Sequence, residues 1–210
     1  MKITQYLIIL LLPVTIILSN LLYLAYRSNI YESIYIKENI YQHFQSKAEV
    51  DNAIKELIGY FRGQNSLEDK LFSYQAEVHL EDVKTLFQTA FFINIFLIFF
   101  LMLTILYFIK NNKLKPLKKS IIIGSSITLC IAIIVAISIT INFDFIFIKF
   151  HELSFNNNYW LFDKSDNLIK LFPPEFFISF AKKLYINILL TVFILIIIMK
   201  LFIKHDKFSI

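Results

Sequence analysis

Four long runs of apolar residues dominate the pattern of the chain. A helix needs about 20 apolar residues to cross the roughly 30 Å hydrocarbon core of a bilayer, and all four runs reach that length. They cover residues 3–26, 86–109, 120–142 and 184–203. The pattern therefore predicts an α-helical polytopic membrane protein with four transmembrane helices.

The first run follows a short basic start and contains Pro13. A secretory signal peptide starts in the same way, but its apolar core is usually about 7–15 residues long and precedes an A-x-A cleavage site. The run here is longer, and no such site follows it. We therefore expect an uncleaved membrane anchor.

The connector at residues 110–119 sets the orientation, because it carries five lysines and no acidic residue. By the positive-inside rule such a loop is cytoplasmic. The C-terminal end agrees, with Lys200, Lys204 and Lys207. Lys182 and Lys183 stand at the outer end of the last run, but two snorkelling lysines weigh little against five. We expect both termini, including the tail at residues 204–210, in the cytoplasm.

The two longer segments, residues 27–85 and 143–183, then lie outside and form a small extracytoplasmic cap. Within the first, residues 30–44 begin with a strand-like alternation of apolar and polar side chains. Residues 48–63 have the spacing of an amphipathic helix, which their final glycine closes. Residues 72–84 are also expected to be helical and to run straight into the second apolar run.

Composition narrows the possible functions. Hydrophobic residues make up 57% of the 210 residues and the mean hydropathy is +0.63, which exceeds the roughly half-apolar usage of soluble domains. The formal charge of +5 is concentrated beside the membrane, and three glycines leave no phosphate-cradling loop. We therefore expect neither nucleic acid nor a nucleotide as partner. The single cysteine, Cys130, falls inside the third run and cannot form an intramolecular disulfide.

The candidate chemistry centres on two histidines beside the apolar runs. His79 comes just before the second run, and His151 comes shortly after the third. Because a short connector makes the helices of these runs antiparallel neighbours, both imidazoles should lie close together at the outer face. A lone interfacial histidine is more often a structural hydrogen-bonding residue, but a pair favours acid/base chemistry.

Both histidines have polar neighbours. Asp82 lies three residues after His79, on the same helical face, where it could orient the ring, and Lys84 follows it. A surface salt bridge is the alternative interpretation of these two residues. The segment after His151 gathers Asn156, Asn157, Asn158, Trp160, Asp163 and Asp166. Its aromatic residues are also typical of an interfacial belt.

Two histidines with carboxylates also suggest a zinc site. The sequence has no H-E-x-x-H pattern, however, and His151-Glu152 lacks a second histidine four residues on, so we expect no metal. No serine stands in a G-x-S-x-G context, and Cys130 lies at the wrong depth to carry an acyl group. Histidine acid/base catalysis without a covalent intermediate or cofactor remains.

The motifs HLEDVK before the second run and FHELSFNNNYWLFDKSDNLI after the third, in a chain with four spans, resemble those of a known family. They are similar to the lipoprotein intramolecular transacylases, Lit, of low-GC Gram-positive bacteria. The resemblance covers nearly the whole chain and places the family's two functionally critical histidines on His79 and His151. The matching surroundings include Asp82, Lys84, Trp160 and Asp166. His43 and His205 match nothing in the family.

The resemblance implies an enzyme that moves the sn-2 acyl chain of a diacylglyceryl lipoprotein to the α-amine of its N-terminal cysteine, giving the lyso-form lipoprotein. Its partners would be the lipoprotein and membrane lipid, and its active site would lie on the extracytoplasmic face of the bacterial cell membrane. Residues that could donate a hydrogen bond to the reaction's oxyanion are Asn157, Asn158, Trp160 and Lys84. The alternatives are a non-catalytic membrane sensor or assembly factor and a metal-dependent lipid hydrolase.

Overall fold

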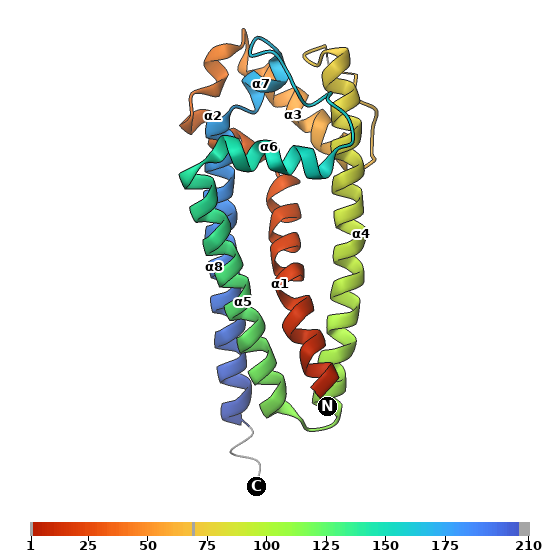
Figure 1. Ribbon diagram of the computed structural model, residues 1–210, viewed down its shortest axis with the longest axis vertical. Coiled ribbons are helices and arrows are strands. Elements are labelled where there is room, and N and C mark those ends of the chain that lie inside the picture. The colour runs from red at the N-terminus through yellow and green to blue at the C-terminus, as the bar shows by residue number, and fades with distance from the viewer. Residues whose placement is uncertain (1, 69, 206–210) are drawn as a thin grey trace. The chain divides into compact units, whose positions relative to one another are not determined.

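The computed structural model describes residues 2–68 and 70–205, with side chains up to residue 201. In that part of the chain the regular elements are all helical (Figure 1). They are α1 (Lys2–Ala25), α2 (Ser28–Lys37), the 3-10 helix η1 (Ile40–His43), α3 (Lys47–Phe61), α4 (Tyr74–Lys110), α5 (Leu114–Ile141), α6 (Phe143–Ser154), α7 (Asn167–Leu171) and α8 (Pro174–His205). Four of them, α1, α4, α5 and α8, are long and apolar enough to cross a membrane. The predicted fold class is confirmed.

The described residues form two compact units. Unit 1 comprises the residues up to Leu21, Phe91–Ala136 and those from Leu184 onward. Unit 2 comprises Leu22–Ala90 and Ile137–Lys183. Each long helix contributes to both units. Residues 206–210 of the predicted tail, with Lys207, lie outside the described residues.

Unit 1 packs the apolar parts of the four long helices around a shared core. The core residues are Ile8, Leu12, Ile16, Leu101, Phe108, Leu117, Ile121, Ala132, Ile188 and Val192. Buried polar side chains add hydrogen bonds between the helices: Asn94 Nδ2 donates to Ser19 Oγ over 3.0 Å, and Thr191 Oγ1 donates to Asn20 Oδ1 over 3.2 Å. In hydrocarbon such bonds stabilise helix pairs modestly, typically by about 0.6 kcal/mol.

Gly124 allows α5 to approach α1 closely. A Cβ atom built on Gly124 would lie 3.1 Å from Leu12 Cδ2 and 3.5 Å from the carbonyl oxygen of Ile8. A methyl group there requires Leu12 to shift, and a larger side chain would separate the helices. This is the role of small residues at helix contacts in membranes.

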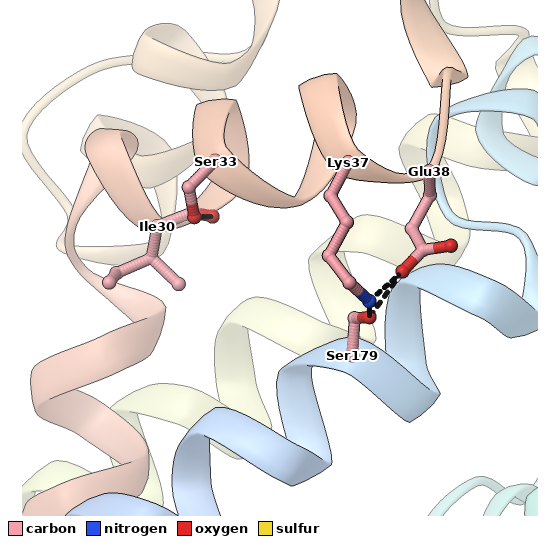
Figure 2. Close-up of polar contacts among 5 residues, drawn as sticks. All are labelled: Ile30, Ser33, Lys37, Glu38 and Ser179. Atoms are coloured by element: carbon pink, nitrogen blue, oxygen red, sulfur yellow. Dashed lines mark hydrogen bonds and ion pairs between the residues drawn. The ribbon is translucent and has the colours of Figure 1, made fainter.

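Unit 2 has its own core, to which α2, η1, α3, α7, the start of α4 and the start of α8 contribute. Its fully buried members include Tyr35, Ile34, Leu57 and Leu171. A polar contact ties α2 to α8 beside this core: Figure 2 shows Lys37 and Glu38 reaching the hydroxyl of Ser179, which accepts from Lys37 Nζ over 2.9 Å and donates to the Glu38 carboxylate.

The strand-like interpretation of residues 30–44 is wrong, because the segment forms α2 and η1. The residues that α2 buries are Tyr31, Ile34 and Tyr35, at the i, i+3 and i+4 spacing of a helix. Polar residues elsewhere in the segment obscure that spacing. Asn39 adopts a left-handed conformation, with φ of 56°, at the junction of the two helices.

Two other expectations for these segments, the amphipathic helix at residues 48–63 and the helical start of the second run, are confirmed. The amphipathic pattern at residues 48–63 is α3, and Gly63 follows its end with a positive φ of 73°. Residues 74–84 form the start of α4, which continues without a break into the apolar run. Pro174 is the first residue of α8, a position where a missing amide proton costs no helical hydrogen bond. The helix thus begins ten residues before the predicted run. The prediction started late because Lys182 and Lys183 interrupt the apolar residues of the first part of the helix.

We predict that Gly124→Leu destabilises unit 1 by about 1–3 kcal/mol, the usual cost of overpacking. The matched control is Ser126→Leu, at an exposed position of the same helix. Thermal unfolding of the purified protein in detergent measures both. Equal midpoints for the two variants would show that α1 and α5 do not depend on close approach at Gly124.

Candidate functional site

One face of α4 carries the polar residues of the site in unit 2. Gln75, His79 and Asp82 stand at positions i, i+4 and i+7, and so project from the same side of the helix. The helix is continuous at this point, since it runs for 37 residues from Tyr74 to Lys110. The position of each side chain is therefore fixed by a rigid backbone.

His79 is buried, with 6% of its surface exposed. Its ring meets Phe155 and Phe162 edge to face, with centroids 5.0 and 5.6 Å away. Within the described part of the chain its Nδ1 has no hydrogen-bond partner. A positive charge on a ring so enclosed by apolar groups is costly, which favours the neutral imidazole.

His151 is brought to α4 by α6. Asn142 caps the start of α6, where its side-chain oxygen accepts a hydrogen bond from the amide of Phe145 over 3.1 Å. His151 is 7% exposed and lies in the last turn of the helix, and its Nδ1 is 2.7 Å from the carbonyl oxygen of Phe147. Because a carbonyl oxygen only accepts, Nδ1 carries a proton in either charge state. In the neutral ring Nε2 is then the atom free to accept a proton.

Burial lowers the pKa of His151 from its ordinary value, and the hydrogen bond to the Phe147 carbonyl opposes that shift in part. The ring is packed among aromatic side chains, with Phe147 at 4.0 Å and Trp160 at 5.0 Å between centroids. The imidazole is therefore neutral at physiological pH. Its Nε2 is the nitrogen that can accept a proton, since Nδ1 is held by the Phe147 carbonyl oxygen.

The two imidazoles face each other. Their centroids are 5.8 Å apart and their planes are inclined by 30°. The sequence predicted this proximity from neighbouring spans, but the structure achieves it through α6, a separate helix that ends beside α4 (Figure 1). The two rings therefore belong to one site of unit 2.

The segment after α6 closes around His79. Asn157 Nδ2 donates to the Asp82 carboxylate over 2.8 Å, and Asn157 Oδ1 accepts from the amide of Tyr159 over 3.0 Å. Gln75 Nε2 donates to two carbonyl oxygens of the same segment, those of Tyr159 at 3.0 Å and Leu161 at 2.9 Å. Asp82, Asn157 and Trp160, all predicted from the sequence, therefore lie around the imidazole pair.

Three other predicted residues make their contacts elsewhere. The Lys84 ammonium lies 4.0 Å above the ring of Tyr60 on α3. Asp166 caps α7 by accepting from the amide of Leu168, and also accepts from Ser73 Oγ. Asn158 is exposed. The contacts of Lys84 and Asp166 lie within unit 2 and do not involve either imidazole.

Sequence reasoning missed Gln75, Phe147 and Phe155. The first two each stand four residues before a histidine, so helical spacing could have placed them beside the rings. In the part of the chain that the structure describes, no group of three or more His, Cys, Asp or Glu side chains is arranged to hold a metal.

One stripe of α6 is apolar, beside the exposed ion pair of Lys149 and Glu152. Ile146, Phe150 and Leu153 follow one another at i, i+4 and i+7, and Phe150 and Leu153 are exposed. Phe150 also meets His151 edge to face, at 5.5 Å between centroids. One aromatic ring therefore belongs both to this stripe and to the surroundings of the histidine pair.

Comparison with solved structures agrees with the fold. The in meso structure of the lipoprotein intramolecular transacylase Lit from Bacillus cereus matches with a TM-score of 0.88 and 23% identity, over 99% of this chain and 98% of that one. Two variants of that protein, in which a histidine is replaced by arginine or by alanine, match with TM-scores of 0.85 and 0.84 at 22% identity. They cover 100% and 99% of this chain, and 94% and 96% of the respective structures. No curated protein sequence matches the chain.

A family profile settles the assignment. Residues 6–177 match the profile described as lipoprotein intramolecular transacylase Lit, which is well over half of the chain. The protein therefore belongs to the lipoprotein intramolecular transacylase family, and it is a membrane-integral acyltransferase of lipoprotein maturation.

Proposed function

We propose that the protein moves the sn-2 acyl chain of a diacylglyceryl lipoprotein to the α-amine of the lipoprotein's N-terminal cysteine, and that His79 and His151 perform the proton transfers. The observation that carries this proposal is the buried pair of imidazoles, 5.8 Å apart, in which Nδ1 of His151 is held by a carbonyl oxygen. Such a pair suits acid/base chemistry near neutral pH. Two solved variants of the Bacillus cereus protein, each with a histidine replaced, agree with a role for histidine.

His151 is the general base in this proposal. The α-ammonium of the substrate has a pKa near ~8 and becomes nucleophilic only after it loses a proton. The amine nitrogen then attacks the ester carbonyl carbon, the new C–N bond forms and the carbonyl oxygen becomes an oxyanion. Nε2 of His151 takes a proton from the attacking nitrogen. Its Nδ1–H bond to Phe147 stabilises the imidazolium that results.

The proton held by His151 then passes to the leaving group. When the tetrahedral intermediate collapses, the bond between the carbonyl carbon and the glyceryl oxygen breaks, and the imidazolium protonates that oxygen. The ammonium has then lost two protons, one to the glyceryl hydroxyl and one to solvent, and an ester has become an amide. No nucleotide or cofactor enters this balance.

His79 stays neutral in the proposed reaction. A second charge beside the His151 imidazolium would be repelled. The nearby carboxylate of Asp82 accepts a hydrogen bond from Asn157, and aromatic rings pack on His79. The N–H of its imidazole can donate to the oxyanion or to the leaving oxygen. Its burial makes such a donor more effective, because water does not compete with it.

The remaining predicted residues act as supports. Asp82 and Asn157 hold the segment that carries Trp160, while Lys84, Asn158 and Asp166 belong to the surrounding cap. The nucleophile and the ester belong to one molecule, so a site that folds the substrate correctly gains effective molarities of ~10⁵ M or more. Orientation is thus the main task of these residues.

We also propose that both termini are cytoplasmic and that the histidine pair lies on the extracytoplasmic face. The basic connector between α4 and α5 supports this orientation through the positive-inside rule. The mature lipoprotein would then meet the site on the side of the membrane where it resides.

We predict that His79→Gln and His151→Gln each lower conversion of a diacylated lipoprotein by about 10²–10⁴-fold, the usual contribution of general acid/base catalysis. Mass spectrometry of the lipoprotein N-terminal peptide measures the lyso product. His43→Gln, at an exposed position of η1, is the matched control and should retain activity. If both site variants insert properly and convert the lipoprotein at an unchanged rate, the catalytic assignment is wrong, and a sensor or assembly role for this protein remains.

We predict that His151 titrates below pH 6.5 in the folded protein and near 6.5 in the unfolded chain. Because the folded state binds this proton more weakly, the corresponding stability is complete above pH 6.5 and is lost as the pH falls through the lowered value. Chemical shifts of ¹⁵N-labelled histidine follow the titration. A midpoint above 6.5 would contradict a buried neutral base.

We predict that a cysteine introduced by Asn156→Cys is labelled by an impermeant reagent on intact cells, and that one introduced by Lys113→Cys is not. Both replacements are made in a chain with Cys130→Ala, so that the introduced thiol is the one that reacts. Labelling after lysis confirms that each thiol reacts. The reverse pattern would place the histidine pair in the cytoplasm.

A further inference from the structure

We propose that Gln75 is a positioning residue, whose amide group holds the backbone on both sides of Trp160 and so keeps the indole against His151. This inference rests on the proposed role of His151 as base. Gln75 lies one helical turn before His79 and touches neither imidazole in any described contact. It therefore acts on the reaction through Trp160.

The hydrogen bonds of Gln75 have an unusual arrangement. Its Nε2 donates to the carbonyl oxygens of Tyr159 and Leu161, at 3.0 and 2.9 Å, and these are the residues immediately before and after Trp160. A side-chain amide has two N–H donors, and both are used here. Two bonds to one short stretch fix its position and its direction.

A second anchor lies on the same face of α4. Asp82 accepts from Asn157, one turn beyond His79. Gln75 and Asp82 thus hold the segment on either side of His79, and Phe155 and Phe162 of that segment pack on the ring. Because α4 is a single rigid helix here, the two anchors, Gln75 and Asp82, keep a constant spacing from His79.

The two anchors position Trp160 relative to His151. Its indole lies 5.0 Å from the His151 ring, with the planes inclined by 35°. It shields the imidazole from water, so losing the contact would hydrate His151 and raise its pKa toward the ordinary value. A larger share of the base would then be protonated and inactive at a given pH.

In the part of the chain that the structure describes, few other charged groups lie near His151 to affect its titration. From α4 it faces His79, near which Asp82 lies. Phe155 and Trp160 of the following segment do not titrate. On α6 itself, Lys149 and Glu152 are paired with each other at 2.6 Å. A changed pH dependence in a Gln75 variant would therefore report mainly on the shielding by Trp160.

The test uses the fluorescence of Trp160, the only tryptophan in the chain. The full-length protein in detergent is compared with Gln75→Leu, which removes both donors, and Gln75→Glu, which keeps the shape but cannot donate twice. Gln88→Leu is the matched control, because Gln88 lies on the same helix beside Gly63. Emission, its pH titration and the rate of lyso-form production are measured for each.

We expect both Gln75 variants to shift the emission to the red, as the indole becomes hydrated, and to move the pH midpoint of emission upward. The turnover rate should fall between about tenfold and a hundredfold, as for a modest misplacement of a reacting group. Gln88→Leu should match the wild type in all three measurements.

Two outcomes would overturn the proposal. Unchanged emission in both Gln75 variants would show that the amide does not place Trp160, whatever the activity. Altered emission with an unchanged rate would also contradict it, and would locate the failure in the role of His151. Since the emission is read without substrate, the two failures are distinguishable.

Discussion

The burial of two neutral imidazoles against each other is the constraint on which the site depends. Among the described residues no carboxylate is hydrogen-bonded to either ring, and each ring is enclosed by aromatic side chains. In such surroundings the charged form of histidine is disfavoured, so the pair remains uncharged, as the proposed roles of base and hydrogen-bond donor require. Polar residues nearby are bonded to one another and hold the surroundings in place. The chemistry is thus set by exclusion of water more than by any single ionic contact.

The fold meets this constraint with two pieces of backbone of different kinds. The start of α4 is rigid and continuous with a membrane-spanning helix, and it presents Gln75, His79 and Asp82 at fixed spacing. The segment that follows α6 is irregular, and its shape comes from side-chain to backbone bonds. The regular helix therefore acts as a template for the irregular segment. This division allows an aromatic enclosure to be built from residues more than seventy positions apart in the chain.

Much of this was accessible from the sequence, for identifiable reasons. Apolar runs indicate membrane helices and amphipathic spacing indicates α3, because both are local signals. The start of α8 was placed ten residues too late, because Lys182 and Lys183 interrupt the apolar pattern that precedes the run. The pairing of His79 with His151 was also predicted, although the structure brings the rings together through α6 and not simply through adjacent span ends. The strand-like alternation in residues 30–44 led to a wrong prediction. The helix α2 has only ten residues, and so few turns that its apolar spacing is hard to distinguish from alternation. The role of Gln75 was hidden, because its partners are backbone carbonyls of a distant segment and backbone atoms leave no trace in a sequence pattern.

The apolar stripe of α6 formed by Ile146, Phe150 and Leu153 suggests a route by which the substrate's acyl chain reaches the histidine pair. Phe150 lies on that stripe beside Leu153 and also borders His151. A hydrocarbon tail that travels along this stripe keeps its methylene groups away from water, at a saving of about 0.8 kcal/mol for each one. In the proposed reaction only the glyceryl ester would then leave its hydration shell at the histidine pair. Delivery along α6 would make long acyl chains no harder to bring to that pair than short ones.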